Sequence, residues 1–392
     1  MNREVVLVSG CRTPIGSFGG SLSSLTAPQL GAIVVRESLR RIEMSTSDVD
    51  EVIMGCVLSA GVGQAPARQA ALFAGLPDSV QAMTINKVCG SGLKAVMLAA
   101  QSIMLGDAEV IVAGGMESMS NAPYLLDKAR SGYRMGHAQL VDSMVKDGLW
   151  DVYNDFHMGS AAELCAKECA VPRDAQDEFS ALSYRRALDA LKNSLFKEEI
   201  VPVRIEQRKS DTIIVDEDEE PKKVNLEKMK LLKPAFQREG TVTAANASKL
   251  NDGAAAVVVM SKEKADALRI KPLAKIVAYG STAKKPAWFT TAPVDVIAKV
   301  LGKVGMEIND IDLFEINEAF AVVTLIVIRL LGLDVNRVNV NGGAVALGHP
   351  IGASGARILV TLLHALKQRN AKTGMAAICI GGGEASAMIV QR

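Results

Sequence analysis

The sequence has few of the histidines and cysteines that metal sites and disulfide scaffolds need, and it lacks the glycine motifs of common nucleotide-binding loops. It holds four histidines and six cysteines in 392 residues, with neither a CxxC pair nor an HExxH motif. A zinc site or a disulfide framework is therefore not predicted. Neither GxGxxG nor GxxxxGKS/T occurs where a strand feeds a helix, which argues against nucleotide binding through those loops. We expect a reduced, cytoplasmic protein without a metal ion.

Strong charge and long apolar runs are also absent. The 44 basic and 43 acidic residues leave a net charge of +1, which provides no electrostatic attraction to nucleic acid or an anionic membrane. The most apolar run, residues 319–328, is half of the roughly 20 residues that a membrane-spanning helix needs. No signal-peptide core of useful length follows residues 1–4. Nucleic acid and membranes are therefore not expected as partners.

The chain is rich in small and aliphatic residues. Apolar residues make up 49% of it, aromatic residues only 4%, and there are 33 glycines. Its length exceeds the roughly 250–300 residues at which single cores divide, so two or three units are expected. Short β-branched runs alternate with alanine-rich stretches, which predicts α/β layers. The expected strands are 5–9, 51–54, 110–113, 274–279, 313–316, 338–340 and 376–380, and the expected helices are 27–41, 92–105, 161–168, 173–193, 293–304 and 356–368.

Two stretches of the chain resemble one another at nearly one offset. Residues 47–55 match 309–317 at an offset of 262, and residues 90–96 match 353–359 at an offset of 263. Two such matches indicate a duplicated α/β unit. We therefore predict an N-terminal half over residues 1–118, a C-terminal half over 249–392, and an inserted loop domain over 119–248.

The inserted segment contains most of the irregular polar sequence. Its charge run at 216–223, DEDEEPKK, is typical of a solvated loop. The alternative is a basic edge beside an anionic ligand, formed by Lys222, Lys223, Lys228 and Lys230.

Cys165 and Cys169 lie four residues apart on an expected helix, and we interpret them as buried helix cysteines. His364 lies in an apolar helix and is expected to be a core residue.

Cys89 stands between an expected strand end and the glycine-flanked start of a helix. Unpaired N–H groups at a helix start favour a thiolate, which predicts a nucleophile; a small buried cysteine at a tight turn is the alternative. His349 lies in a glycine-rich loop at almost the equivalent place in the second half. If the halves are related by pseudo-symmetry, Cys89 and His349 converge as the thiol–imidazole pair of nucleophilic catalysis. A structural loop histidine is the other interpretation.

Three further candidates lie at or just beyond the ends of expected strands. Cys379 precedes three glycines, 381–383, whose N–H groups could hold an oxyanion. Asn317 and Glu318 come directly after the strand 313–316. If they are buried, their polar side chains need partners. They either hydrogen-bond neighbouring loops or position water or substrate.

Together these motifs resemble the thiolase family over essentially the whole chain. The matching pieces, in order, are RTPIG (12–16), VCGSG (88–92), GGMESMS (114–120), NEAF (317–320), GHPIG (348–352) and CIGGG (379–383). His157 and Met158 make the resemblance closest to the short-chain, acetoacetyl-CoA type. The resemblance implies αβαβα layers built from two five-stranded halves with an inserted loop domain, and a homo-oligomer, most often a tetramer.

The resemblance also implies acetyl-CoA C-acetyltransferase activity by a ping-pong mechanism. Cys89 would attack one acetyl-CoA, His349 would accept the thiol proton, and Cys379 would deprotonate the methyl group of a second acetyl-CoA. Asn317, through a water, and His349 would form one oxyanion hole; the N–H groups of Cys89 and Gly381 would form the other. Acetyl-CoA, acetoacetyl-CoA and CoA are thus the implied partners.

The same resemblance implies which residues form the substrate pocket. Ser248 would contact the pantetheine arm, and the pocket would be lined by His157, Met158, Phe320, Leu149, Phe236, Ala244 and Phe289. No resident cofactor is implied, because CoA is substrate and product. Mitochondrial members bind potassium near 244–247 and Val345 with a tyrosine whose position holds Pro221 here, which argues against potassium dependence. The alternatives are a 3-ketoacyl-CoA thiolase for longer or 2-methyl-branched substrates, and a catalytically idle acyl-CoA-binding protein. A β-ketoacyl synthase is more remote.

Overall fold

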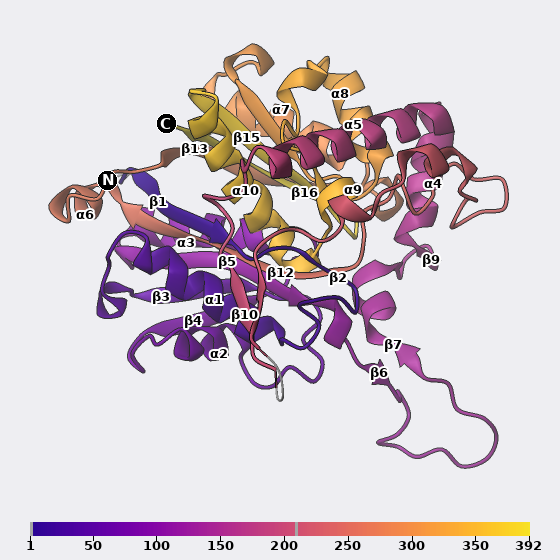
Figure 1. The fold of residues 1–392 in the computed structure, drawn as a ribbon, viewed down its shortest axis with the longest axis horizontal. Helices are drawn as coiled ribbons and strands as arrows, with labels where there is room; N and C mark the ends of the chain where they lie inside the picture. Colours follow the sequence, from indigo (N-terminus) through magenta and orange to yellow (C-terminus); the bar gives the residue numbers. More distant parts are fainter. Residues whose placement is uncertain (1–2, 208–210) are drawn as a thin grey trace.

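Two similar α/β halves form the body of the protein (Figure 1), whose computed structural model describes residues 3–207 and 211–392. The main sheet of the described chain has the order β14-β15-β16-β13-β1-β12-β5-β3-β4. Its N-terminal strands are β1 (Val5–Arg12), β3 (Glu51–Gly55), β4 (Gln81–Ile85), β5 (Val110–Ser118) and β12 (Asn251–Ser261). Its C-terminal strands are β13 (Ala274–Ala283), β14 (Leu313–Ile316), β15 (Thr373–Ile380) and β16 (Glu384–Gln391).

The two halves repeat one pairing pattern, which confirms the duplication predicted from the sequence. In the first half β3 pairs parallel with β5, which continues antiparallel through β12 to β1. In the second half β14 pairs parallel with β15, which continues antiparallel through β16 to β13. In the described part of the main sheet, the strands of the two halves pair where β1 meets β13, at Val6–Lys275 and Leu7–Ala274. Residues 251–261, expected in the C-terminal half, therefore form a strand of the N-terminal sheet.

The strand expected at residues 338–340 does not form. Residues 338–340 were expected to be extended, but only Val338 forms a parallel bridge, to Phe314 of β14. Asn339 has a φ of 46°, a left-handed conformation that interrupts an extended backbone. Its side chain instead accepts from the N–H of Ile316 at 2.7 Å and donates to the C=O of Ile316 at 2.8 Å, which replaces strand pairing there.

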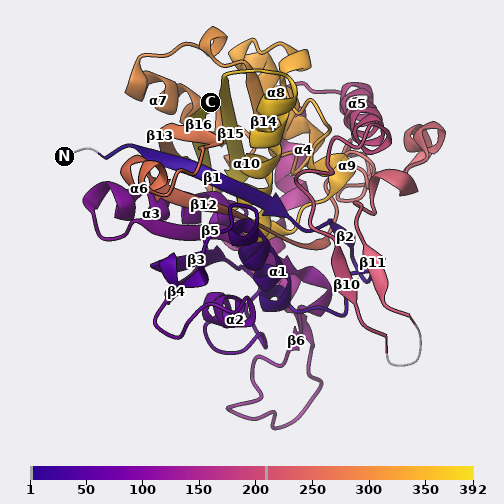
Figure 2. The same ribbon diagram turned by 60° about the vertical axis from the view of Figure 1, so that its left-hand side comes forward.

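Helices cover both outer faces of the sheets and fill the space between them, as Figures 1 and 2 show. The outer N-terminal layer contains α1 (Ala27–Arg40) and α2 (Pro66–Phe73), and the outer C-terminal layer α7 (Ala292–Val304) and α8 (Ala321–Leu331). The middle layer is α3 (Ser91–Leu105) with α10 (Ile351–Gln368). Strand β12 serves two layers, because Ala254 and Val258 face the outer core while Ala255 and Val257 face the middle one. These are the predicted αβαβα layers.

The two middle helices approach one another at glycines that the duplication relates. A Cβ added at Gly92 would lie 2.7 Å from the N of Ala356, and one added at Gly355 would lie 2.4 Å from the N of Leu93. In both cases the atom that the added Cβ would meet belongs to the main chain, so a rotamer change cannot make room for a side chain.

The window Val88–Leu105 is apolar enough to cross a membrane by composition, but 56% of it is buried inside the protein, so α3 is a core helix.

The inserted segment wraps around one side of the two halves. It contains α4 (Met158–Glu168) and α5 (Arg173–Lys192), and α9 (Ala344–Leu347) packs against α5 from the C-terminal half. The short strand pairs are β6 (Tyr124–Leu125) with β7 (Val141–Asp142), β8 (Trp150–Asp151) with β9 (Phe156–His157), and β10 (Val203–Ile205) with β11 (Ile213–Val215); β2 (Gly16–Ser17) pairs with β12, and α6 (Lys262–Ala267) follows β12.

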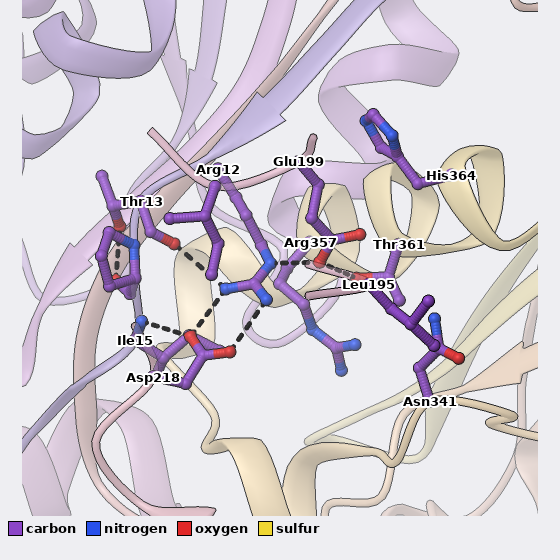
Figure 3. Close-up of polar contacts among 12 residues, drawn as sticks. Arg12, Thr13, Ile15, Leu195, Glu199, Asp218, Asn341, Arg357, Thr361 and His364 are labelled. Atoms are coloured by element: carbon purple, nitrogen blue, oxygen red, sulfur yellow. Dashed lines mark hydrogen bonds and ion pairs between the residues drawn. The ribbon is translucent and has the colours of Figure 1, made fainter. Parts of the chain in front are cut away.

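The acidic run of this segment is anchored to the body, and its interpretation as a solvated loop was wrong for Asp218. Figure 3 shows the buried Arg12 guanidinium between two carboxylates, with Glu199 at 2.6 Å and Asp218 at 2.7 and 2.9 Å. Asp218 also accepts the N–H of Ile15, and Glu199 accepts from Thr361 of α10 at 3.1 Å. Arg12 thus joins β1, the inserted segment and, through Glu199, the central helix.

We predict that Gly355→Ala lowers the free energy of unfolding by about 1–3 kcal/mol, the usual range for overpacking a tight core contact. Gly302→Ala is the matched control, because Gly302 lies in α7 and a Cβ there meets nothing within 4 Å. The control should gain up to about 1 kcal/mol from helix propensity. Thermal or denaturant unfolding measures both, and equal stability of the two variants would contradict the close helix contact.

Candidate active site

Cys89 lies in a strained turn between β4 and α3. The preceding residue, Val88, has a φ of 45°, an uncommon conformation for a β-branched residue. Local hydrogen bonds hold the turn: the N–H of Val88 donates to the Asn86 side chain at 2.9 Å, and Ser91 Oγ donates to the C=O of Val88 at 2.6 Å. The strain is thus maintained by neighbours, which is typical of a functional position.

The thiol of Cys89 is in its neutral form, in contrast to the thiolate that its position at a helix start predicted. The N–H groups of Gly381 and of Cys89 itself face the sulfur and favour the thiolate. Burial outweighs them, and the charge of Glu117 adds to it, so the pKa of Cys89 is raised to about 11. Attack by Cys89 therefore needs a base that removes the thiol proton.

His349 has the tautomer of such a base. Ser354 Oγ donates its proton to the C=O of Pro350 at 2.9 Å, so it accepts from His349 Nδ1–H at 2.6 Å. The proton is then on Nδ1, and Nε2 is a free acceptor, buried without a partner in the described protein. Burial, with a smaller contribution from the Arg357 charge, lowers the pKa of His349 to about 3 and keeps the ring neutral.

Cys379 and Asn317 lie deeper than these two. Cys379 is 1% exposed at the end of β15, and burial raises its pKa well above the ordinary value; the nearby Cys89 thiol raises it further. Neither amide atom of the buried Asn317 side chain has a hydrogen-bond partner in the described structure. A buried amide without a partner is a place for an ordered water or a substrate oxygen.

Glu318, beside Asn317, has the opposite role. It accepts from Ser183 at 2.7 Å, from Asn339 at 2.8 Å and from the N–H of Val345 at 3.1 Å, so it holds loops together. The loop-bonding interpretation therefore holds for Glu318, whereas the positioning of water or substrate by Asn317 stays a prediction.

A cavity of about 590 Å³ opens onto the Cys89 turn. It is lined by every residue predicted for the site except Asn317 and Cys379: Cys89, His349, Gly381, Ser248, His157, Met158, Phe320, Leu149, Phe236, Ala244 and Phe289. Lys223 also lines it, which places one lysine of the charged run beside the cavity. The pseudo-symmetry therefore brings Cys89 and His349 to one cavity, as predicted.

An aromatic cluster forms part of the cavity wall. His157 stacks on Phe236 with ring centroids 4.9 Å apart, and Phe320 meets the edges of Phe236 at 6.2 Å and Phe289 at 6.4 Å. His157 Nδ1 accepts the N–H of Gly159 at 3.0 Å, so the ring also caps α4. Phe289 is 3% exposed and lines the cavity.

Sequence reasoning missed the residues that orient His349. Asn251 accepts the N–H of His349 at 2.9 Å and donates to the C=O of Gly16 at 2.9 Å. Ser354, which binds Nδ1, is the repeat equivalent of Ser91, and that correspondence was the one available signal. Glu117 was noted only as part of a motif. It accepts the N–H of Gly352 at 2.8 Å at the start of α10, and burial raises its pKa to about 7.

The remaining candidates are structural. His364 is buried, with Nε2 3.3 Å from the C=O of Gly10, as a core residue should be. The Cys165 and Cys169 sulfurs lie 4.0 Å apart. Cys165 is buried in α4, but Cys169 is half-buried and caps the end of that helix, so the expectation of two buried helix cysteines was wrong for Cys169. No cluster of three or more histidine, cysteine or acidic side chains suited to a metal ion occurs among residues 3–207 and 211–392. The absence of a metal stays a prediction.

Comparison with known proteins gives matches over the full chain. Residues 5–263 match the family profile described as "Thiolase, N-terminal domain", and residues 270–392 match "Thiolase, C-terminal domain". The acetyl-CoA acetyltransferase of Cupriavidus necator is 56% identical over 390 residues, with 99% of each chain covered. That of Pseudomonas aeruginosa is 54% identical, with 100% of each chain covered.

The structural match is equally complete. The crystal structure of the Bacillus anthracis acetyl-CoA acetyltransferase superposes with a TM-score of 0.97 and 42% identity, covering all of both chains. Two family profiles that together span almost the whole sequence, and relatives above 50% identity along its length, leave one assignment: this chain is a member of the thiolase family.

Proposed function

We propose that this protein is an acetyl-CoA C-acetyltransferase, an acyltransferase that reversibly condenses two acetyl-CoA molecules to acetoacetyl-CoA and CoA. The names of relatives more than 50% identical over the full length support this activity. The observation that carries it in this chain is the pair formed by the neutral thiol of Cys89 and the free Nε2 of His349 at one cavity.

In the first half-reaction the sulfur of Cys89 attacks the carbonyl carbon of acetyl-CoA, and its proton passes to His349 Nε2. The N–H groups of Cys89 and Gly381 receive the developing oxyanion; such donors are worth about 3–4 kcal/mol each in acyl transfer. The C–S bond to CoA breaks, and the protonated His349 returns its proton to the CoA thiolate. The acetyl group remains on Cys89 as a thioester.

In the second half-reaction Cys379 removes a proton from the methyl group of another acetyl-CoA. The resulting enolate attacks the acetyl carbon on Cys89, a carbon–carbon bond forms, and the Cys89 sulfur leaves as a thiolate. That thiolate takes the proton from Cys379, which restores the Cys89 thiol and the Cys379 thiolate base. Asn317, through a water, and His349 stabilise the enolate oxygen. A charge on Cys89 raises the pKa of Cys379, and an acetylated Cys89 can carry no charge, so Cys379 is the one thiol of the pair that can ionise in the acetyl-enzyme. The two thiols therefore act in turn.

We assign different residues of the cavity lining to the different parts of CoA. Ser248, Leu149, Phe236 and Ala244 hold the pantetheine arm, and Lys223 stands beside the cavity for a phosphate group. His157, Met158, Phe320 and Phe289 enclose the acyl end. The buried Phe289 ring favours a two-carbon acyl group, so longer or 2-methyl-branched substrates are the second choice. Both the cysteines and the free histidine nitrogen argue against an idle binding protein.

The protein is further proposed to act in lipid metabolism, without a resident cofactor or added potassium, in a reducing compartment such as the cytoplasm. The support for the compartment is that all six cysteines are free thiols, two of them at the site. Finding the protein in an oxidising compartment by cell fractionation would contradict this.

Substrate preference tests the activity. We expect CoA-dependent thiolysis to be fastest with acetoacetyl-CoA, and slower with 2-methylacetoacetyl-CoA and a 3-keto-octanoyl thioester, because Phe289 closes the acyl end. The measurement is kcat/KM for each. Higher kcat/KM for the eight-carbon thioester would reject the short-chain assignment, and CoA binding without turnover of any substrate would reject the enzyme.

Mutation should distinguish the roles of the two proposed active-site thiols. Cys89→Ala is expected to abolish the acetyl-enzyme, whereas Cys379→Ala should still be acetylated but lose condensation by at least about 100-fold, as loss of an acid–base group does. Mass spectrometry after incubation with acetyl-CoA detects the intermediate. Cys169→Ala is the control, since Cys169 lies outside the cavity lining, and it should retain both steps. Acetylation at the same peptide in Cys89→Ala would refute the nucleophile.

A homotetramer is also proposed. Figure 1 shows the loop between β6 and β7 extending away from the body, and it exposes apolar side chains: Tyr124, Leu126, Tyr133, Met135 and Leu140. Met135 is 100% exposed in the single chain, and apolar groups gathered on such an arm favour contact with another copy. Light scattering should give four chains, and fewer after residues 126–140 are replaced by a short glycine–serine linker. A monomeric intact protein would contradict the proposal.

A further inference from the structure

Lys249 places an ammonium group in the cavity wall, and nothing in the mechanism uses it. Its Nζ donates to two backbone carbonyls, that of Ala247 at 2.9 Å and that of Val345 at 3.1 Å. It also lies 5.4 Å from the ring centroid of Tyr184 on α5. A lysine that is turned inward onto carbonyl groups has given up most of its hydration, so the contacts require a reason.

The carbonyl of Val345 needs a partner because of how α9 ends. In a continuing helix it would accept the N–H of His349, four residues later. That N–H is instead bound to Asn251 at 2.9 Å, which turns the chain toward the cavity. The Lys249 ammonium takes the position that the helix leaves open. Asn251 and Lys249, two residues apart, thus hold both sides of the turn that carries His349.

The other carbonyl belongs to the loop that carries Ser248. That loop is bonded to the NEAF segment, through Ser248 N–H to the C=O of Ala319 at 3.0 Å and Ala321 N–H to the C=O of Asn246 at 2.8 Å. Lys249 is therefore the link between this loop and the His349 turn. Burial lowers the pKa of Lys249 to about 8, and the carboxylates of Glu220 and Glu318 oppose this by Coulomb attraction to its ammonium group.

We propose that Lys249 is a positioning residue, a built-in monovalent cation that holds the Ser248 loop and the His349 turn in register around the bound CoA thioester. This inference rests on the proposed function. It names a specific requirement: the two carbonyls and the neighbouring carboxylates need one positive charge between them. The enzyme then needs no monovalent cation from solution, because its own side chain supplies the charge.

Removal of the charge should leave a place that a small cation from solution can enter. Lys249→Met keeps an unbranched apolar stem and deletes the ammonium, and Lys249→Gln keeps a neutral N–H donor without the charge. Lys303→Met is the matched control. Lys303 also donates to a backbone carbonyl, that of Tyr279 at 2.9 Å, and lies 5.5 Å from the Tyr279 ring centroid, but on α7 outside the cavity lining.

The test measures kcat and KM for acetoacetyl-CoA thiolysis in sodium buffer, with added ammonium, potassium or tetramethylammonium chloride at equal ionic strength. Both Lys249 variants should lose about 10- to 100-fold in kcat/KM, the effect of a lost hydrogen bond to a charged group, with a rise in KM. Ammonium or potassium should raise the kcat/KM of these variants at least threefold, whereas tetramethylammonium, which is too large for the site, should not raise it. The wild type and Lys303→Met should respond to none of them.

Wild-type kinetics in Lys249→Met, or a loss that ammonium and potassium restore no better than tetramethylammonium, would overturn the proposal. If Lys249→Gln has the kcat/KM of the wild type without any added cation, a neutral donor is sufficient, and the proposal is overturned too. Thermal unfolding of each variant separates loss of the fold from loss of position. The wild-type rate itself tests the proposed function, so failure of that function is visible before any variant is compared.

Discussion

The close contact of α3 with α10 is the constraint on which the rest of this structure depends. Gly92 and Gly355 let the two backbones meet, and Gly115 allows the C=O of Gly352 to approach a position only 2.0 Å from where its Cβ would be. Because both helices start at the same end of this contact, the turns that precede them, with Cys89 and His349, open onto one cavity. The low aromatic content fits the same constraint, since five layers can pack this closely only with small side chains.

Burial, more than any ionic partner, sets the chemical state of the site. It raises the pKa of Cys89 to about 11, raises that of Cys379 further, and lowers that of His349 to about 3. Burial therefore favours the uncharged form of all three groups before a substrate is bound. A neutral, water-poor site makes each charge that develops during acyl transfer depend on the fixed N–H groups and on His349. Reactivity is thus coupled to substrate binding.

The inserted segment is held by buried charges. Arg12 binds Glu199 and Asp218, and Figure 3 shows these residues meeting below the central helix that carries Thr361 and Arg357. A buried ion network contributes little net stability, because desolvation opposes the Coulomb attraction. It does, however, fix which segment lies where. Here it brings the run that includes Glu220 and Lys223 to the cavity, where a flexible loop would leave the opening undefined.

The sequence alone determined the α/β class and the duplication and supplied the candidate reactive residues, because each is encoded in local pattern: strand and helix periodicity, a repeated stretch, and polar residues at strand ends. It did not determine that β12 belongs to the first sheet, that the acidic run is anchored, or that Asn251, Ser354 and Lys249 surround His349. These depend on contacts between residues far apart in the chain, as Asn251 and His349 are. Only the tertiary structure decided the protonation of the thiols, since the helix start favours a thiolate locally while burial, a property of the whole fold, opposes it more strongly.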